Sequence, residues 1–220
     1  AHGTSDKYMA RRAAKLLGKP LDQTNLITCH IGSGSSISAI KNGKCIDTSM
    51  GLTPLDGLMM GTRCGSIDPA TVGFLMRNAG LDIDAVDKMM TKQSGLLGIC
   101  GVNDMRDVHA QIATGNEKAK LALDMLTYRI RGFIGNYFAQ LNGELDALVF
   151  TAGVGENDEI VRREVVNGLT GLGFKLNEEE NDKRPGEYAL ISATDSKFKI
   201  YVIRTNEELE IANETLALMN

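Results

Sequence analysis

The sequence lacks the features that mark membrane-spanning, disulfide-stapled and nucleic-acid-binding proteins. It has no tryptophan and only four prolines, and no apolar run approaches the ~18 residues that a membrane-spanning helix needs. Four cysteines, at positions 29, 45, 64 and 100, show no paired spacing, so we expect reduced thiols rather than a disulfide framework or a zinc site. The 28 acidic residues nearly balance the 24 basic ones, and the resulting net charge of -4 disfavours nucleic acid or an anionic lipid surface as a partner.

The opening residues lack the basic and then apolar order of a signal peptide, and we therefore expect a cytoplasmic protein. What the sequence does contain is 43% hydrophobic and 24% charged residues, together with 24 glycines. With 220 residues, this composition predicts a globular chain with one large domain or two small ones. The glycines raise the question of whether tight backbone turns gather where a phosphate group could bind.

Hydrophobic periodicity predicts helices that alternate with strands, which is an α/β fold. The predicted helices cover residues 5–17, 69–78, 83–92, 116–141 and 158–169, with a last helix after residue 205. The predicted strands cover residues 25–31, 35–41, 44–50, 145–151, 188–193 and 199–203. Asn42-Gly43 favours a two-residue hairpin turn, and residues 51–68 are expected to form a loop.

Capping residues mark several of these helix ends. Ser5 is predicted to cap the first helix, and Pro69 to open the second at its first helical position. Thr205 and Glu208 have the spacing of a capping box for the last helix. The long apolar stripe between residues 119 and 141 is compatible with a core face and with an interface to a partner.

Two glycine-containing segments follow predicted strands, where open α/β sheets bind ligands. Residues 30–36 (His-Ile-Gly-Ser-Gly-Ser-Ser) combine glycines and hydroxyls that suit phosphate oxygens, although a simple hairpin or bulge explains them equally well. Residues 151–157 (Thr-Ala-Gly-Val-Gly-Glu-Asn) lead into a helix and suit a nucleotide, without the full spacing of the dinucleotide fingerprint or of the P-loop.

Two further segments carry charge at helix starts. Arg63 lies in a polar turn and either clamps a phosphate or carboxylate or is simply solvated. Glu207 and Glu208 lie in a first helical turn, where they either complement the helix dipole or bind magnesium. Of the histidines, His109 reads as a surface residue, whereas His2 and His30 lie in Gly/Ser/Thr-rich contexts that favour a functional role.

Taken together and in this order, the segments resemble the acetate kinase family, within the acetate and sugar kinase, heat-shock chaperone and actin superfamily. The resemblance spans essentially the whole chain, and its most specific part is the run from residue 51 to residue 63. The matching segments are residues 2–5 (His-Gly-Thr-Ser), 30–32 (His-Ile-Gly), 51–63 (Gly-Leu-Thr-Pro-Leu-Asp-Gly-Leu-Met-Met-Gly-Thr-Arg), 104–106 (Asp-Met-Arg), 151–157 (Thr-Ala-Gly-Val-Gly-Glu-Asn) and 205–208 (Thr-Asn-Glu-Glu).

The resemblance implies an α/β fold with a ribonuclease-H-like (actin-like ATPase) core, a mixed sheet flanked by helices. It also implies reversible, Mg²⁺-dependent, in-line phosphoryl transfer between ATP and acetate, giving ADP and acetyl phosphate. Because the family has two similar domains, residues 1–220 are expected to be its C-terminal domain only. The phosphate loop, a second active-site arginine and an aspartate of the other domain are absent, so we expect impaired activity of this chain alone.

Carried over residue by residue, the resemblance implies that His2 and Arg63 are catalytic and stabilise the transferring phosphoryl group. Pro54 would line the pocket for the substrate methyl group, and Glu207 would help to hold Mg²⁺. The residues implied in nucleotide binding are His30, Gly32, Gly34, Asp104, Arg106, Gly153, Val154, Gly155 and Asn157.

This sequence departs from the common family pattern at several positions. Asp6 stands where histidine is usual, which is expected to alter a neighbouring hydrogen bond, and Ser33 replaces an asparagine of the phosphate loop. Cys64 and Ser66 stand where serine and aspartate are usual beside Arg63, and the loss of that aspartate is expected to loosen the arginine.

Two alternatives stay open at this point. The chain could be a catalytically inactive nucleotide-binding and dimerisation module, because family dimers form through this domain. It could also belong to a kinase for a slightly longer acid such as propionate, since most of the acyl pocket belongs to the missing half. The expected partners are acetate or acetyl phosphate, ATP or ADP and a second copy of the chain, with no nucleic acid and no membrane.

Overall fold

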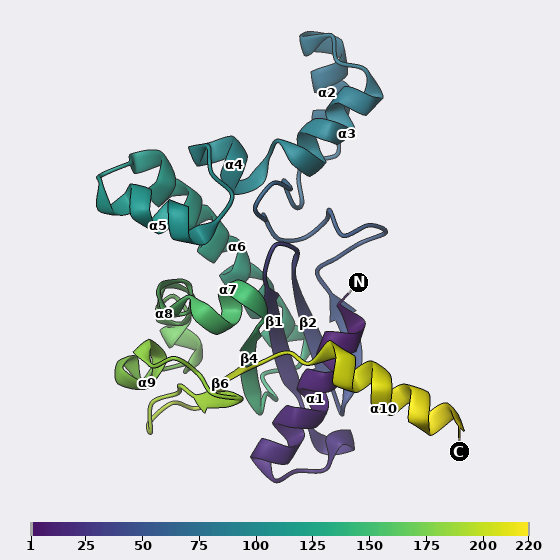
Figure 1. Ribbon diagram of the computed structural model, residues 1–220, viewed down its shortest axis with the longest axis vertical. Helices are drawn as coiled ribbons and strands as arrows, with labels where there is room; N and C mark the ends of the chain where they lie inside the picture. Colours follow the sequence, from purple (N-terminus) through teal and green to yellow (C-terminus); the bar gives the residue numbers. More distant parts are fainter. Residues whose placement is uncertain (1, 220) are drawn as a thin grey trace. The chain divides into compact units, whose positions relative to one another are not determined.

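The computed structural model describes residues 2–219, apart from the side chains of residues 213, 214 and 217–219 (Figure 1). Its contacts divide the chain into two compact units. Unit 1 comprises residues 2–32, 36–49 and 130–219 and contains most of a six-stranded sheet, and unit 2 comprises residues 33–35 and 50–129. Within the described residues, no helix is long and apolar enough to cross a membrane.

The sheet of unit 1 has the strand order β3-β2-β1-β4-β6-β5 and mixes parallel with antiparallel pairs. β1 pairs with β4 and β4 with β6 in parallel, whereas the β2/β3 and β5/β6 pairs are antiparallel. Every residue of β1 and β4 is buried, as expected of central strands covered on both faces. The strands are β1 (Leu26–Ile31), β2 (Ser35–Lys41), β3 (Lys44–Thr48), β4 (Ala147–Thr151), β5 (Tyr188–Leu190) and β6 (Lys199–Ile203).

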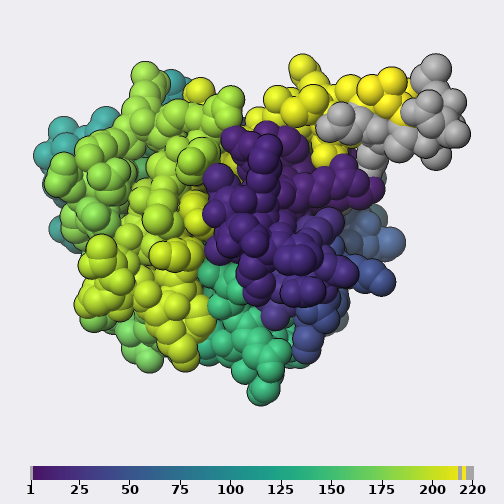
Figure 2. Space-filling model, turned by 90° about the horizontal axis from the view of Figure 1, so that it is seen from below, coloured from purple at the N-terminus to yellow at the C-terminus, as the bar shows by residue number. Residues whose placement is uncertain are grey.

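Helix α1 (Gly3–Leu17) packs on this sheet through an apolar face. Met9, Ala10 and Ala13 are buried in one cluster with strand residues that include Leu26, Val149 and others from β2 and β6. The helix ends at Gly18, whose φ of 65° is the left-handed conformation that glycine adopts without strain. Helix α10 (Glu207–Met219) lies beside α1, as Figure 2 also shows, and the buried Glu210 accepts a 2.6 Å bond from Arg11.

Most of the remaining helices of unit 1 follow the strand β4. Asp158 and Asn177 each accept a hydrogen bond from a backbone N–H in the first turn of their helices, which is the expected role of such residues at a helix start. These elements are α7 (Ala152–Asn157), α8 (Glu159–Asn167) and α9 (Glu178–Asp182), together with the second half of α6 (Glu117–Gln140) and the short η1 (Leu21–Gln23) and η2 (Thr170–Leu172).

Unit 2 is helical apart from a glycine-rich segment at residues 50–69, which is predicted as a loop and is one. Asp82 caps α3, and Asp104 caps α5. The helices are α2 (Ala70–Ala79), α3 (Ile83–Lys92), α4 (Gly95–Cys100), α5 (Met105–Ala113) and the first half of α6.

Backbone anchors fold the segment at residues 50–69 tightly. The N–H of Ser94 donates to Thr62, that of Leu96 to Met60 and that of Cys64 to Met90. Gly95 is required here because its φ is 62° and an added Cβ would lie 2.0 Å from the carbonyl oxygen of Met60. The segment is therefore held in place although it has no regular secondary structure.

Two predicted helix starts are wrong, and several short helices are not predicted. α1 begins at Gly3 rather than at Ser5, whose hydroxyl lies beside other side chains instead of capping the helix. α10 begins at Glu207, and its first turn is capped by Asn206, which accepts from the N–H of Leu209, not by Thr205. Residues 152–157, predicted to lead from a strand into a helix, themselves form the short helix α7, and the helices α4, α5 and α9 are not among the predicted ones.

Candidate active site

The parallel pairing brings the carboxyl ends of three strands of unit 1 to one edge of the sheet. His30 at the end of β1 is in register with Thr151 at the end of β4, and Phe150 is in register with Val202 of β6. Residues that follow such strand ends share one edge, which is the usual ligand site of open α/β sheets. The segments 30–36, 151–157 and 205–208, which sequence reasoning selected, therefore begin at or just after this edge.

Two histidines form the centre of this edge. The rings of His2 and His30 stack with centroids 3.7 Å apart and planes inclined by 17°. Nδ1 of His2 lies 2.8 Å from the hydroxyl of Ser36, and Nδ1 of His30 lies 3.0 Å from the hydroxyl of Ser5. Two residues 28 positions apart are thus fixed as one aromatic pair with oriented ring nitrogens.

Burial controls the protonation of His30. Only 8% of this residue is exposed, and the loss of solvation, with a smaller contribution from His2, lowers the pKa of its imidazole to about 4. His30 is therefore neutral at pH 7, so the ring can present a proton on only one of its two nitrogens.

Asp6 lies in the first turns of α1, close to this pair in the sequence. Its carboxylate accepts hydrogen bonds from Thr28 at 2.7 Å and Ser38 at 2.8 Å. Burial raises the pKa of Asp6 in spite of these two bonds, and the charge of Glu207 adds to the increase. Asp6, which stands where the family usually has histidine, is thus buried and accepts hydrogen bonds from two hydroxyl groups.

The β4–α7 junction is organised by Glu156, a buried carboxylate to which sequence reasoning assigned no role. Its Oε1 accepts from the N–H of Ala152 at 3.0 Å and from the N–H of Thr205 at 2.9 Å. Ala152 has a φ of 66°, which is unusual for a residue other than glycine and costs about 1–2 kcal/mol. Glu156 therefore stabilises a strained turn and ties it to the start of α10.

Within the same junction, the predicted nucleotide-binding residues fall into two groups. Gly153 and Asn157 are exposed and linked by a bond from the Asn157 side chain to the Gly153 carbonyl, and Val154 is half-buried. Gly155 is buried against β1, where an added Cβ would lie 3.5 Å from the carbonyl oxygen of Cys29. Gly153, Val154 and Asn157 are thus accessible to a ligand, whereas Gly155 serves close packing.

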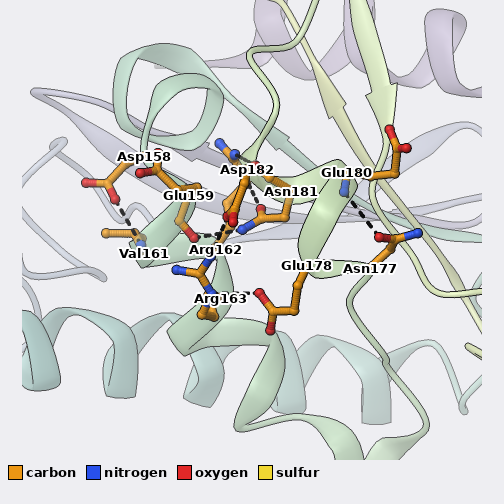
Figure 3. A network of polar contacts seen from close by, with 10 residues as sticks. All are labelled: Asp158, Glu159, Val161, Arg162, Arg163, Asn177, Glu178, Glu180, Asn181 and Asp182. Carbon is orange, nitrogen blue, oxygen red and sulfur yellow. Dashed lines mark hydrogen bonds and ion pairs between the residues drawn. The ribbon is translucent and has the colours of Figure 1, made fainter.

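A buried arginine supports this junction from behind. Nη1 of Arg162 donates to the carbonyls of Gly155 and Glu156 at 3.0 Å each. Nε and Nη2 donate to the side chain and carbonyl of Asn181, which lies beside Arg162 in Figure 3. Asn181 in turn donates to the carbonyl of Glu159. This network holds the carbonyl end of α7 against α8 and α9.

Glu207, the predicted magnesium ligand, is exposed at the first residue of α10. Across the part of the chain that is described, no three His, Cys, Asp or Glu side chains gather into a group that could hold a metal. Magnesium commonly binds through one or two carboxylates and the phosphates of its substrate, so a single exposed carboxylate fits that partial role.

In unit 2, the segment at residues 50–69 positions Arg63. Nη1 of Arg63 donates to the carbonyl of Pro54 at 3.1 Å and lies 3.6 Å from the sulfur of Met60, and the residue as a whole is half-buried. Ser66, at the position where the family usually has aspartate, donates its hydroxyl to Asp56 at 2.6 Å. The side chain of Pro54 is itself exposed. Unit 2 therefore brings together two of the predicted residues, the catalytic Arg63 and the acyl-pocket Pro54.

Asp104 and Arg106, predicted on the ribose and adenine side, form an ion pair at the start of α5. The guanidinium of Arg106 donates to both carboxylate oxygens of Asp104, at 3.0 Å and 2.6 Å. The bond from Arg106 lowers the pKa of Asp104 to about 2. Gly32 and Gly34 are half-buried in the turn between β1 and β2.

The sequence matches a known protein family over almost its whole length. The model of the acetokinase family matches residues 1–213. The chain belongs to the acetokinase family. Known acetate kinases include one from Oleidesulfovibrio alaskensis that is 56% identical over 218 residues, which is 99% of this chain and 54% of that protein.

Solved structures agree with the acetokinase assignment and confirm the predicted fold class, a mixed sheet flanked by helices in an actin-like ATPase core. The acetate kinase of Porphyromonas gingivalis matches with a TM-score of 0.95 at 43% identity, covering 100% of this chain and 55% of that one. A propionate kinase from Francisella tularensis matches with a TM-score of 0.91 at 47% identity, covering 97% of this chain and 54% of that one. The acetokinase chain spans about half the length of the relatives it matches.

Sequence reasoning missed three residues of the acetokinase site. Ser5 and Glu156 lie inside the matching motifs, but each has a partner in Thr205, which is 200 residues from Ser5 and 49 residues from Glu156. No sequence feature pointed to Arg162, because an arginine in a helix with both charged and apolar residues is expected to be exposed to solvent. Only the packing of α8 against α9 places its guanidinium in the interior.

Proposed function

We propose that this chain is the C-terminal domain of an acetate kinase and that the whole enzyme transfers a phosphoryl group reversibly between ATP and acetate with Mg²⁺. The observation that carries the proposal is the stacked pair of His2 and His30 at the carboxyl edge of the sheet, in a chain 56% identical to proteins named acetate kinase. In the forward reaction an acetate oxygen attacks the γ-phosphorus while the bond to the bridging oxygen of ADP breaks.

The proposed roles follow from where charge develops. Negative charge spreads over the three equatorial oxygens of the transferring group, and donors fixed in advance lower its energy. In unit 1, His2 supplies a ring N–H, while His30, Gly32 and Gly153 line the nucleotide phosphates. In unit 2, Arg63 supplies a permanently charged donor that the Pro54 carbonyl orients. Bound Mg²⁺ would neutralise phosphate charge, with Glu207 among its protein ligands.

The nucleotide and acyl contacts complete the proposal. Gly34, Val154 and Asn157 would accommodate the nucleotide, with Gly155 packed behind them against β1. Asp104 and Arg106 would flank its ribose and adenine, and Pro54 would contact the acetate methyl group. The exposed carboxylate of Glu207 and the exposed surfaces of Gly153 and Asn157 support these assignments because each is accessible from solvent.

The experiment couples acetyl phosphate and ADP to ATP formation in the complete enzyme. Arg63→Ala is expected to lower kcat about 100- to 1,000-fold, because a single donor to transition-state charge contributes on that scale. Arg77→Ala, a change at an exposed arginine in the last turn of α2, is the matched control and is expected to leave kcat unchanged. Equal kcat values for Arg63→Ala and the parent enzyme would refute the role of Arg63.

A propionate kinase is the second candidate, because a solved protein of that name is 47% identical to this chain. The kcat/KM values for acetate and propionate in the same assay decide between the two. A higher kcat/KM for propionate would identify the enzyme as a propionate kinase.

We also propose that the enzyme is a cytoplasmic homodimer. Leu121, Met125 and Tyr128 of α6 are exposed at 51%, 41% and 68%, and their spacing places them on one helix face. Sedimentation at micromolar concentration tests the dimer, and a single monomeric species would contradict it.

A further inference from the structure

A chain of hydrogen bonds links His30 to the buried carboxylate of Glu156. The hydroxyl of Ser5 lies 3.0 Å from Nδ1 of His30 and 3.3 Å from the hydroxyl of Thr205. The backbone N–H of Thr205 donates to Oε1 of Glu156 at 2.9 Å. Ser5 is fully buried, and all four residues belong to unit 1. The chain therefore joins α1, β1, the start of α10 and the β4–α7 junction.

Each hydroxyl in this chain carries one proton, and that fact restricts the direction of the bonds. If Nδ1 of His30 were protonated, it would donate to Ser5, Ser5 would donate to Thr205, and the Thr205 proton would have no acceptor among the described contacts. In the opposite direction Thr205 donates to Ser5, and Ser5 donates to a bare Nδ1. Only this second direction gives both hydroxyl protons an acceptor within the described contacts, because the half-buried Thr205 hydroxyl has no other side-chain partner there.

We propose that Ser5 is a positioning residue that donates its proton to Nδ1 of His30 and thereby keeps the ring proton on Nε2. The neutral ring then presents an N–H donor on the side away from Ser5, as an anionic phosphate oxygen requires. With the proton on Nδ1 instead, Nε2 would present a lone pair and repel the same oxygen. The phosphate part of this inference rests on the proposed function, whereas the position of the proton does not.

Glu156 contributes indirectly. By accepting the N–H of Thr205 it fixes that residue where its hydroxyl can reach Ser5, and by accepting the N–H of Ala152 it fixes the strained turn of the nucleotide segment. One carboxylate therefore aligns the turn at residues 151–157 with the donor nitrogen of His30.

The test is nitrogen-15 NMR of the protein labelled at histidine, at pH 7.5. Protonated and bare imidazole nitrogens resonate in well-separated ranges, and the spectrum of His30→Gln identifies the His30 signals among only three histidines. We expect a protonated Nε2 and a bare Nδ1 shifted by an accepted hydrogen bond. A protonated Nδ1 with a bare Nε2 would overturn the proposal.

Variants show whether the hydroxyl chain sets this state. Ser5→Ala is expected to move the Nδ1 signal, through loss of the bond or a mixture of tautomers, and Thr205→Val is expected to move it in the same direction. Thr205→Ser keeps the hydroxyl and should keep the parent signal. Ser192→Ala removes a buried hydroxyl that has no described partner and serves as the matched control. Identical His30 signals in Ser5→Ala and the parent would overturn the role of Ser5.

ADP binding measured by calorimetry supplies the functional arm. Ser5→Ala is expected to weaken ADP about fivefold, with Ser192→Ala unchanged. An unchanged ADP affinity in Ser5→Ala would overturn the positioning role. If the parent protein bound no ADP, the proposed function would fail, while the NMR spectra would still decide where the proton lies.

Discussion

Three ionisable residues in the interior of unit 1 have protonation equilibria set by burial. Burial raises the pKa of Asp6, lowers that of His30 to about 4 and lowers that of the Arg162 guanidinium. Each has hydrogen-bond partners that limit the cost of its burial: hydroxyls for Asp6, Ser5 for His30, and carbonyls with Asn181 for Arg162. The local chemistry of the site thus depends on which polar groups the fold places beside each residue.

The low pKa of His30 predicts acid sensitivity. The unfolded chain takes up this proton near pH 6.5 and the folded chain only near pH 4, so the contribution of His30 to stability is complete above pH 6.5 and is lost as pH falls toward 4. We expect the free energy of unfolding to fall by on the order of 2 kcal/mol from this residue between pH 7 and pH 4.5. Urea titrations at pH 7 and pH 4.5 measure this change in the free energy of unfolding. His30→Asn should reduce the difference, and an equal pH dependence in this variant would contradict the assignment.

Ser192 provides a prediction at a residue outside the site. Its hydroxyl is buried and has no hydrogen-bond partner among the residues described. Because burying an unsatisfied hydroxyl is unfavourable, Ser192→Ala is expected to raise the free energy of unfolding by about 1 kcal/mol. Urea unfolding measures the change, and a loss of stability would reveal a polar contact of Ser192 that the structure does not contain.

At the scale of elements, adjacent arginines on α8 have different environments. Arg162 is 2% exposed and donates four hydrogen bonds that join α7 to α9, whereas Arg163 forms ion pairs with Glu178 and Asp182 near the surface (Figure 3). The helical pattern alone places the two residues 100° apart around the axis. The packing of α9 decides which of them is buried.

Replacing these two arginines separates the two kinds of interaction. Arg162→Ala leaves the carbonyls of Gly155 and Glu156 and the amide of Asn181 without their donor, and it is expected to cost about 3 kcal/mol of stability. Arg163→Ala removes partly exposed ion pairs and is expected to cost less than about 1 kcal/mol. Denaturant unfolding of both variants makes the comparison, and equal losses would show that the Arg162 network is not specially stabilising.

Gly95, the first residue of α4, and Gly101, which follows its last residue, offer a second matched pair. Gly95 and Gly101 both have positive φ, at 62° and 83°, but an added Cβ meets the Met60 carbonyl at 2.0 Å at the first and nothing within 4 Å at the second. Gly101→Ala is therefore expected to cost about 1 kcal/mol and Gly95→Ala at least ~2 kcal/mol more, since backbone must shift there. Thermal and urea unfolding measure the stability of both variants. Equal losses would mean that the backbone at Met60 can shift at little cost in free energy.

At the scale of the whole molecule, the candidate catalytic residues are distributed over two units. His2 and His30 lie in unit 1 and Arg63 lies in unit 2, and the chain spans 54% of a relative named acetate kinase. Phosphoryl transfer depends chiefly on positioning several donors together. We therefore expect the proposed phosphoryl transfer to need both units together with the half of the relatives that this chain does not cover.

We accordingly expect the 220-residue chain alone to bind ADP without measurable turnover of acetyl phosphate. Calorimetry with ADP and the coupled ATP assay measure the two properties on the same sample. Turnover by the chain alone that Arg63→Ala abolishes would contradict this expectation and would show that the isolated chain contains a sufficient site.

The sequence by itself determined the α/β class, the strands, the Asn42-Gly43 turn with φ values of 51° and 71°, and the family, because these depend on local periodicity, on backbone preferences and on motif order. It also selected the three strand-end segments that meet at one edge of the sheet. Only the tertiary structure decided that Ser5 faces His30, that Glu156 joins two chain segments 49 residues apart and that Arg162 is buried. Those contacts join residues distant in sequence, and a side chain's protonation and partners follow from what packs around it rather than from its neighbours along the chain.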